Sequence, residues 1–328
     1  QGYLTVWPTD VDKPLASSIN YGPGTSVANS VLVPIGADGT ISIEAGVAAT
    51  HVVADVTGWS ASTPDYLPLT PARLLDTRAP DGTGAIGVTV DSQAAGEGAL
   101  APGTTYTLDV AGRGLVPDDA AAVAINLTVT DSEGPGYLTA WPCNGDAPLA
   151  STINYTQPLA LANSVVVPLS ADGTLCIVSG VSATHVVADV TGAYGDTDEF
   201  GGLVPARLLD TRAPGTDIGI TVDGEQAGDG VLTPGETVEL QVIGRGEVPE
   251  GTRLVALNLA GVDTTGPGYL TVWACGTDRP LASSLNYTAA GTTISNSVIV
   301  PVSADGKVCI YSGVATTHVV VDVTAYYL

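Results

Sequence analysis

The sequence of 328 residues has no methionine, one phenylalanine and few bases: ten lysines and arginines stand against 34 acidic residues. The formal net charge is −24. Nucleic acid is excluded as a partner, because phosphate binding requires a basic surface. No apolar run approaches the roughly 18 residues that a membrane span requires, so we expect no span. The acidity itself is explained by a solvated surface that keeps the protein soluble.

Glycine and proline are abundant, at 40 and 22 residues, which disfavours long helices and is typical of short strands joined by turns. Hydrophobic residues make up 45% of the chain, enough for real cores. The chain begins at Gln1 without an initiator methionine, so we expect a processed or fragmentary form.

A long internal repeat is the dominant signal. The segment Gly2-Tyr3-Leu4-Thr5-Val6-Trp7 recurs from Gly136 and from Gly268, each time followed by Asn-Ser-Val, Ala-Asp-Gly and Thr-His-Val-Val. We call this unit the A half. A second unit, the B half, runs from Pro-Ala-Arg-Leu-Leu-Asp-Thr-Arg, at 71–78 and 205–212, to a strand with Asn-Leu, at 126–127 and 258–259. The order is A-B-A-B-A.

The junctions indicate which halves belong together. The junction from B to A, at 131–136, is short and predicts a hairpin, whereas the junctions from A to B, at 60–68 and 195–202, are polar and predict linkers. The folding unit is therefore B followed by A, about 130 residues, a usual domain size. We predict a half repeat at 1–59 and complete domains at 65–194 and 200–328.

Each complete unit reads as eight short strands. In the last unit we expect strands near 207–211, 237–243, 253–261, 268–274, 282–287, 296–302, 307–311 and 316–324. Asp305-Gly306 between two of them is a hairpin signal. The pattern predicts an all-β protein of tandem antiparallel β-sandwiches, either jelly-roll or immunoglobulin-like.

The four cysteines occur in pairs. Cys143 and Cys275 follow the repeated tryptophan, Cys176 and Cys309 follow the Asp-Gly turn, and the half repeat lacks both. Because the two positions are filled or empty together, we predict disulfides Cys143–Cys176 and Cys275–Cys309 and an extracellular, oxidising location. Their spacing does not fit zinc, and we predict no metal site and no cofactor.

Charged residues within the strands predict buried ion pairs. The candidates are Arg73, Asp76, Arg78 and Asp189, with the copies Arg207, Asp210, Arg212 and Asp322. Buried charges must be paired, so we expect Arg73 or Arg78 to bind Asp189, and Arg207 or Arg212 to bind Asp322. Asp55 of the half repeat should then lack an arginine of its own domain. An anion or carboxylate site is the less favoured alternative.

No pattern predicts catalysis. The three histidines, His51, His185 and His318, each precede an aspartate by four residues, which on a strand places the two roughly 13 Å apart. No nucleophile accompanies them. Acidic loops at 91–98 and 223–230 lack a recognisable calcium pattern. We predict no enzyme.

The repeated aromatic strand offers a candidate contact surface. The candidates for glycan or subunit contact are Tyr3, Trp7, Tyr137, Trp141, Tyr269 and Trp273. Their face is either open, for stacking on sugars or subunits, or covered, and we favour covered because exposed aromatic patches are uncommon without a partner.

Together, the Pro-Ala-Arg-Leu-Leu-Asp-Thr-Arg, Gly-Tyr-Leu-Thr-Val-Trp-Pro and Thr-His-Val-Val motifs resemble a repeat of secreted and surface proteins of actinobacteria and related Gram-positive bacteria. The resemblance implies a wall-associated, adhesive or structural role. We predict an extracellular structural protein, a subunit of a filament, fibre or surface layer, whose half repeat is completed by a neighbouring chain, with other copies of itself as the expected partners. The alternative is a carbohydrate-binding or adhesion module that binds cell-wall or extracellular glycans.

Overall fold

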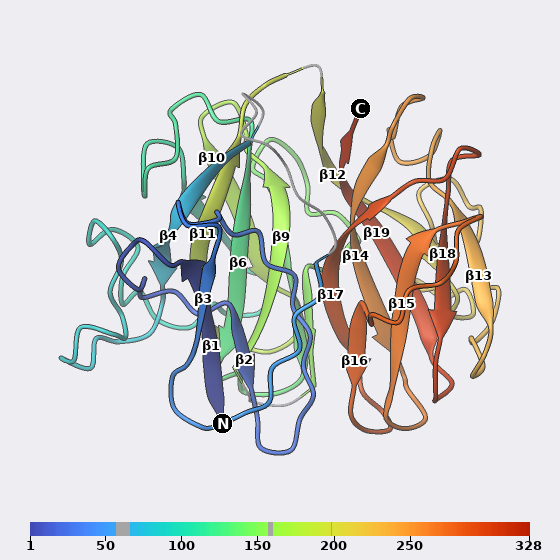
Figure 1. The fold of residues 1–328 in the computed structure, drawn as a ribbon, viewed down its shortest axis with the longest axis horizontal. Helices are drawn as coiled ribbons and strands as arrows, with labels where there is room; N and C mark the ends of the chain where they lie inside the picture. Colours follow the sequence, from blue (N-terminus) through green and yellow to red (C-terminus); the bar gives the residue numbers. More distant parts are fainter. Residues whose placement is uncertain (57–65, 157–159, 198) are drawn as a thin grey trace.

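The chain folds into antiparallel sheets without helices in the part that the computed structural model describes, residues 1–56, 66–156, 160–197 and 199–328. Five sheets form two β-sandwiches and one smaller three-stranded sheet, so the predicted all-β tandem sandwich fold is confirmed. The two sandwiches stand side by side, with the blue N-terminal strands against the green strands of the first (Figure 1). None of the described residues forms a helix that could cross a bilayer.

The first sandwich consists of two four-stranded sheets, with strand orders β4-β11-β6-β9 and β5-β10-β7-β8. Its strands are β4 (Tyr66–Asp76), β5 (Thr105–Asp109), β6 (Ala122–Thr130), β7 (Gly136–Pro142), β8 (Ile153–Tyr155), β9 (Leu161–Pro168), β10 (Thr174–Ser179) and β11 (His185–Tyr194). The B half supplies β4 to β6, and the A half supplies β7 to β11.

The second sandwich repeats this arrangement, with orders β12-β19-β14-β17 and β13-β18-β15-β16. Its strands are β12 (Phe200–Asp210), β13 (Thr237–Gln241), β14 (Leu254–Val262), β15 (Gly268–Ala274), β16 (Leu285–Tyr287), β17 (Ile294–Pro301), β18 (Lys307–Ser312) and β19 (His318–Tyr327). They lie within a few residues of the predicted strands, except that β12 begins earlier.

The two halves of a repeat interleave in one sheet. Strand β11 of the A half pairs on one side with β4 and on the other with β6, both from the B half. In the second sandwich β19 lies between β12 and β14 in the same way. This four-stranded sheet therefore cannot form from an A half alone, because its central strand would lose both neighbours.

Two hairpin predictions are wrong. Residues 131–136 connect β6 to β7, and Asp305-Gly306 connects β17 to β18, but in each case the two strands lie in opposite sheets. The turn itself is present, since Gly306 has a φ of +80° and its N–H donates to Ser303 O. A turn motif specifies a chain reversal, and burial of the apolar faces then sends the next strand into the other layer.

The predicted linkers are shorter than expected. Strand β12 begins at Phe200, which pairs with Tyr327 of β19 and whose ring stacks on Tyr194 with centroids 4.2 Å apart. Strand β4 begins at Tyr66, and positions 60–65 of the other predicted linker lie outside the described residues.

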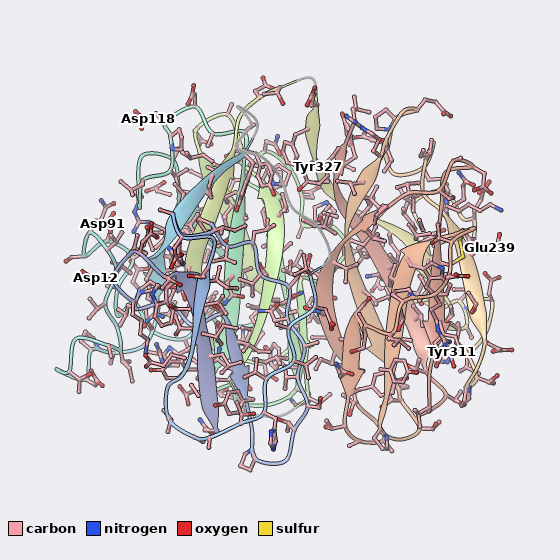
Figure 2. The ribbon with its side chains drawn as sticks, in the orientation of Figure 1. Asp12, Asp91, Asp118, Glu239, Tyr311 and Tyr327 are labelled. Carbon is pink, nitrogen blue, oxygen red and sulfur yellow. A yellow bond between two sulfur atoms is a disulfide. The ribbon has the colours of Figure 1, made fainter. Side chains whose placement is uncertain are left out.

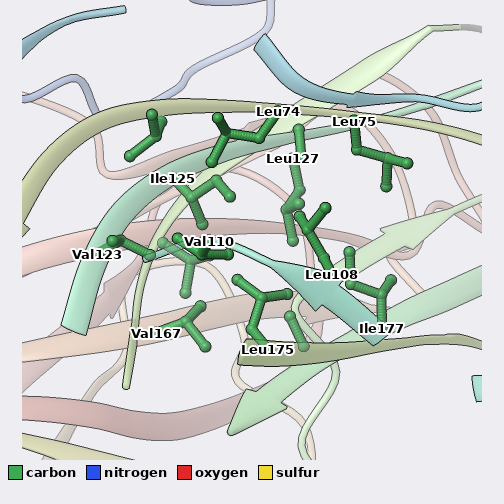
Figure 3. Close-up of a cluster of buried hydrophobic side chains, with 14 of the residues drawn as sticks. Leu74, Leu75, Leu108, Val110, Val123, Ile125, Leu127, Val167, Leu175 and Ile177 are labelled. Carbon is green, nitrogen blue, oxygen red and sulfur yellow. The ribbon is translucent and has the colours of Figure 1, made fainter. Parts of the chain in front are cut away.

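Each sandwich has its own apolar core between its two sheets. In the first sandwich Leu74 and Ile125 come from one sheet and Leu108, Leu175 and Ile177 from the other, all of them fully buried (Figure 3). The alternating apolar positions of the facing strands therefore meet as the sequence pattern requires.

The predicted disulfides are present. Cys143 bonds to Cys176, and Cys275 to Cys309, and no described cysteine is free. Each bond ties the segment after the repeated tryptophan to the neighbouring strand, β10 or β18. Two such bonds indicate an oxidising environment.

Replacing both Cys143 and Cys176 with serine should lower the free energy of unfolding of the first sandwich by about 3 kcal/mol, because the unfolded chain regains loop entropy. Urea denaturation measures this loss. The Cys275→Ser/Cys309→Ser variant should show a similar loss in the second sandwich, and an unchanged midpoint for both would contradict the prediction.

Candidate assembly site

The half repeat leaves a strand-forming segment without partners. Its sheet contains β1 (Gly2–Pro8), β2 (Ile19–Tyr21) and β3 (Ile41–Ala45), the counterparts of β7, β8 and β10. Residues 51–56, which correspond to the start of β11, form no strand and are exposed. Val53 and Val56 are 86% and 89% exposed, whereas their counterparts Val187 and Val190 are buried. The segment thus retains the sequence of a buried strand but lacks the B-half strands that would bury it.

A buried ion pair joins the two halves of the first sandwich. Arg73 on β4 donates from Nε to Asp189 Oδ1 on β11 at 2.9 Å, and from Nη1 to Asp76 Oδ2 at 3.4 Å. Arg78 instead binds Asp76, with Nη2 2.7 Å from Oδ2. Of the two arginines predicted as partners of Asp189, the structure therefore selects Arg73.

Burial and pairing act in opposite directions on these groups. Burial raises the pKa of Asp189, and Arg73 opposes the rise. Burial also disfavours the charged form of Arg73, yet Asp189 and Asp76 together outweigh burial and raise the pKa of the guanidinium. The arginine stays charged, so the carboxylate is held as its counterion.

The second sandwich repeats the arrangement. Arg207 Nε donates to Asp322 Oδ1 at 2.9 Å, and Arg212 Nη2 donates to Asp210 Oδ2 at 2.6 Å. Arg207 also donates from Nη2 to the carbonyl of Leu149 in the first sandwich, at 3.0 Å. The same arginine therefore contributes both to the core of its own repeat and to the contact with the preceding one.

Asp55 is the counterpart of Asp189 in the half repeat. It is exposed, and no ion pair to it occurs among the described residues. Without a B half, the position that would be paired and buried faces solvent.

Asp189→Asn should lower the free energy of unfolding of the first sandwich by about 3 kcal/mol, because it leaves a buried guanidinium short of its counterion. Asp55→Asn is the matched control and should change the stability little. Thermal or urea denaturation compares the two variants. Equal effects would contradict the role assigned to the pair.

Sequence patterns alone did not single out two further arginines. Arg113 binds Asp91 through Nε at 2.7 Å and Nη2 at 2.9 Å, and also donates to Leu74 O. Arg245 binds Asp223 in the same way. The Gly-Arg-Gly triplet repeated at 112–114 and 244–246 is the signal that could have found them. Each arginine ties an acidic loop to its sandwich, so these two aspartates serve an ion pair.

The hydrogen bond from Arg113 lowers the pKa of Asp91 to about 2. Because the folded pKa lies below the unfolded value, the pair stabilises the fold above about pH 3.9 and loses this contribution as the pH falls toward 2. Arg113→Gln should raise the pKa of Asp91 toward its ordinary value. Carboxyl ¹³C titration measures it, with Asp223, at about 2, as the unchanged reference. A pKa near 2 in the variant would refute the assignment.

The histidines of the complete repeats have structural contacts. His185 Nδ1 lies 3.0 Å from Thr77 Oγ1, and His318 Nδ1 lies 3.1 Å from Thr211 Oγ1. Their i+4 aspartates bind the arginines instead. Over the described residues, no group of three or more His, Cys, Asp and Glu side chains has the geometry to hold a metal ion.

The repeated aromatic residues lie on the outer face of the sheet, opposite the core. Each tyrosine ring lies over the glycine that directly follows the neighbouring strand, as Tyr137 does over Gly180. Trp141 is only 3% exposed and donates to Gly145 O, so it is not available to a glycan. Tyr3, Trp7, Tyr269 and Trp273 are half-buried, and Tyr137 is exposed. The face is therefore covered in part, and differently in each copy.

Two asparagines join the first sandwich to the second, and each recurs at the equivalent position of the other repeats. Asn163 Nδ2 donates to Asn258 Oδ1 at 3.0 Å, and Asn163 Oδ1 accepts from Ser297 N at 2.8 Å. Asn258 Nδ2 donates in turn to Ser151 O. An A half thus docks on the B half, and on one A-half strand, of the next repeat.

The half repeat docks on the first sandwich through the equivalent contacts. Asn29 Nδ2 donates to Asn126 Oδ1 at 3.0 Å, and Ser164 N donates to Asn29 Oδ1 at 3.0 Å. Asn126 Nδ2 donates to Ser17 O at 2.7 Å. The interface between neighbouring repeats is therefore itself a repeat. In the sequence, Asn126 begins an Asn-Leu-Thr glycosylation triplet, and no neighbouring residue indicates that it binds the half repeat.

Apolar contacts complete the interface. Leu32, Val166 and Ile299, at equivalent positions in the three A halves, belong to one apolar cluster with Phe200. Tyr327 lies in the same cluster, and its hydroxyl lies 3.0 Å from that of Tyr194. Figure 2 shows Tyr327 between the two sandwiches. The acidic residues Asp91 and Glu239 lie at opposite outer edges of the molecule (Figure 2).

Comparison with known proteins identifies no family. No family model matches the chain, and no curated protein matches it. Among solved structures, the N-terminal CBM22-1-CBM22-2 tandem domain from Paenibacillus barcinonensis Xyn10C is similar over 79% of this chain and 99% of its own length, with 12% identity. The TM-score is 0.19, too low to support any conclusion about function.

Proposed function

We propose that this protein is an extracellular structural repeat protein, a subunit of a filament, fibre or surface layer, without a catalytic role of its own. The observation that carries the proposal is the half repeat, which has the sequence of a central strand at 51–56 and no flanking strand among the described residues. The two disulfides fit an extracellular setting. The docking of each repeat on the next supplies a mode of assembly along one direction.

Assembly would proceed by strand addition. A chain that offers strands equivalent to β4 and β6 would pair with both edges of residues 51–56 and cover Val52 and Val56. Its arginine would reach Asp55 as Arg73 reaches Asp189. Both the exposed backbone groups and the exposed valines favour such a partner, because free strand edges and apolar patches associate.

The test is the size of the native material, by analytical ultracentrifugation and electron microscopy. We expect elongated assemblies, which Val52→Glu/Val56→Glu should abolish because the charges would enter a core. Val47→Glu, at another exposed apolar position of the half repeat, is the control and should leave them intact. Native material in which this chain is present only as a monodisperse monomer would refute the proposal.

Glycan binding is the second candidate, and one local feature favours it. On the outer face of the second sandwich, Tyr269 and Tyr311 lie with ring centroids 6.2 Å apart, next to the half-buried Trp273. Arg279 lies over the Tyr311 ring, 3.6 Å from its centroid. The other two A halves lack this set, since Glu44 and Val178 take the place of Tyr311.

Trp273→Ala should reduce binding to cell-wall or extracellular glycans on a glycan array at least tenfold, because stacking on this face would lose its largest ring. Trp141→Ala, at the buried counterpart, is the control for general loss of fold. Absence of any glycan signal from the wild-type protein would reject this candidate.

A further inference from the structure

An A half contacts the next repeat through three residue positions, and the same three positions recur in every A half. In the first sandwich these are Leu149, Ser151 and Asn163, and all three contact the B half of the second sandwich. We call this set the docking surface. In the half repeat it comprises Leu15, Ser17 and Asn29, and Leu15 lines a pocket with Arg73 of the next B half.

The docking surface of the second sandwich comprises Leu281, Ser283 and Asn296. Leu281 is 103% exposed, whereas Leu149 is 56% exposed. Asn296 is only 4% exposed, and its Nδ2 donates to Ser284 O at 2.8 Å, but its Oδ1 has no hydrogen-bond donor among the described residues. The equivalent oxygens of Asn29 and Asn163 each accept a serine N–H of the next repeat. A buried acceptor without a donor is costly, so this oxygen marks a missing partner.

We propose that the docking surface at Leu281, Ser283 and Asn296 binds a third B half, together with the A half that completes it. The inference rests on the proposed structural function and names the partner. The identity of the occupant follows from continuity, because the same surface is occupied by a B half in both preceding repeats. The B-half asparagine would bind Ser283 O and Asn296, and a serine N–H would bind Asn296 Oδ1.

A second copy of this chain cannot bind this docking surface unless one of its own B halves first separates from the A half that contacts it. Each copy has three A halves and two B halves. The asparagines of both B halves are already bound, Asn126 by the half repeat and Asn258 by the first sandwich. The occupant is therefore a further B half of the same repeat whose asparagine is not already bound by an A half.

A chain extended at its C-terminus tests the surface directly. After Leu328, a second copy of residues 195–328 is added, so that the natural linker places a new B half beside Asn296. In the existing interface Asn154 N donates to Ser295 Oγ of the next repeat. The equivalent amide, that of Asn286, should therefore exchange with solvent at least tenfold more slowly in the extended chain than in the natural one, as measured by NMR.

The control is Ser295→Ala in the added copy only, which removes the acceptor and should return the Asn286 amide to its rate in the natural chain. Protection of the Asn154 amide reports that the existing repeats are folded. A second extended chain, with about eight glycine and serine residues inserted in the new linker, excludes a strained connection. Unchanged exchange of Asn286 in both extended chains, with Asn154 protected, would overturn the proposal. Assembly of the native material is a separate measurement, so the two proposals fail independently.

Discussion

The pairing of one A-half strand between two B-half strands is the constraint on which the structure depends. Strand β11 buries its backbone against β4 and β6 and places Asp189 against Arg73. A buried arginine requires its counterion, and a central strand requires both neighbours. Neither half of a repeat can satisfy these conditions alone. The exposed segment 51–56 of the half repeat is the direct consequence.

Much of this architecture could be predicted from the sequence, because features that recur in every copy of the repeat stand out from those that do not. Strand positions, the paired cysteines and the charged strand residues recur at fixed spacing, and a residue pattern present or absent as a set indicates a contact. The sequence did not predict contacts between residues that lie far apart in the chain. The Asp305-Gly306 turn specifies a reversal but not which sheet the next strand joins. The sequence around Asn126 and Asn258 does not indicate their role, because their hydrogen-bond partners lie in a neighbouring repeat.

The interface between repeats follows the same logic as the repeat itself. The A-half asparagine donates a hydrogen bond to the B-half asparagine, which donates in turn to a backbone carbonyl of the A half. An apolar cluster that includes Phe200 and Tyr327 contains residues of both sandwiches. Because the interface is copied with the repeat, each added unit brings a new docking surface of the same kind. Among the described residues, segment 51–56 has no flanking strand and Asn296 Oδ1 has no hydrogen-bond donor.

Hydrogen exchange of the amides at 52–56, compared with those at 186–190, tests the central claim most directly, since the two segments share a sequence and differ in their neighbours. In the isolated chain the account predicts rapid exchange at 52–56 and strong protection at 186–190. Equal protection of the two segments in the monomer would contradict it, because it would mean that an A half forms this strand's hydrogen bonds without a B half.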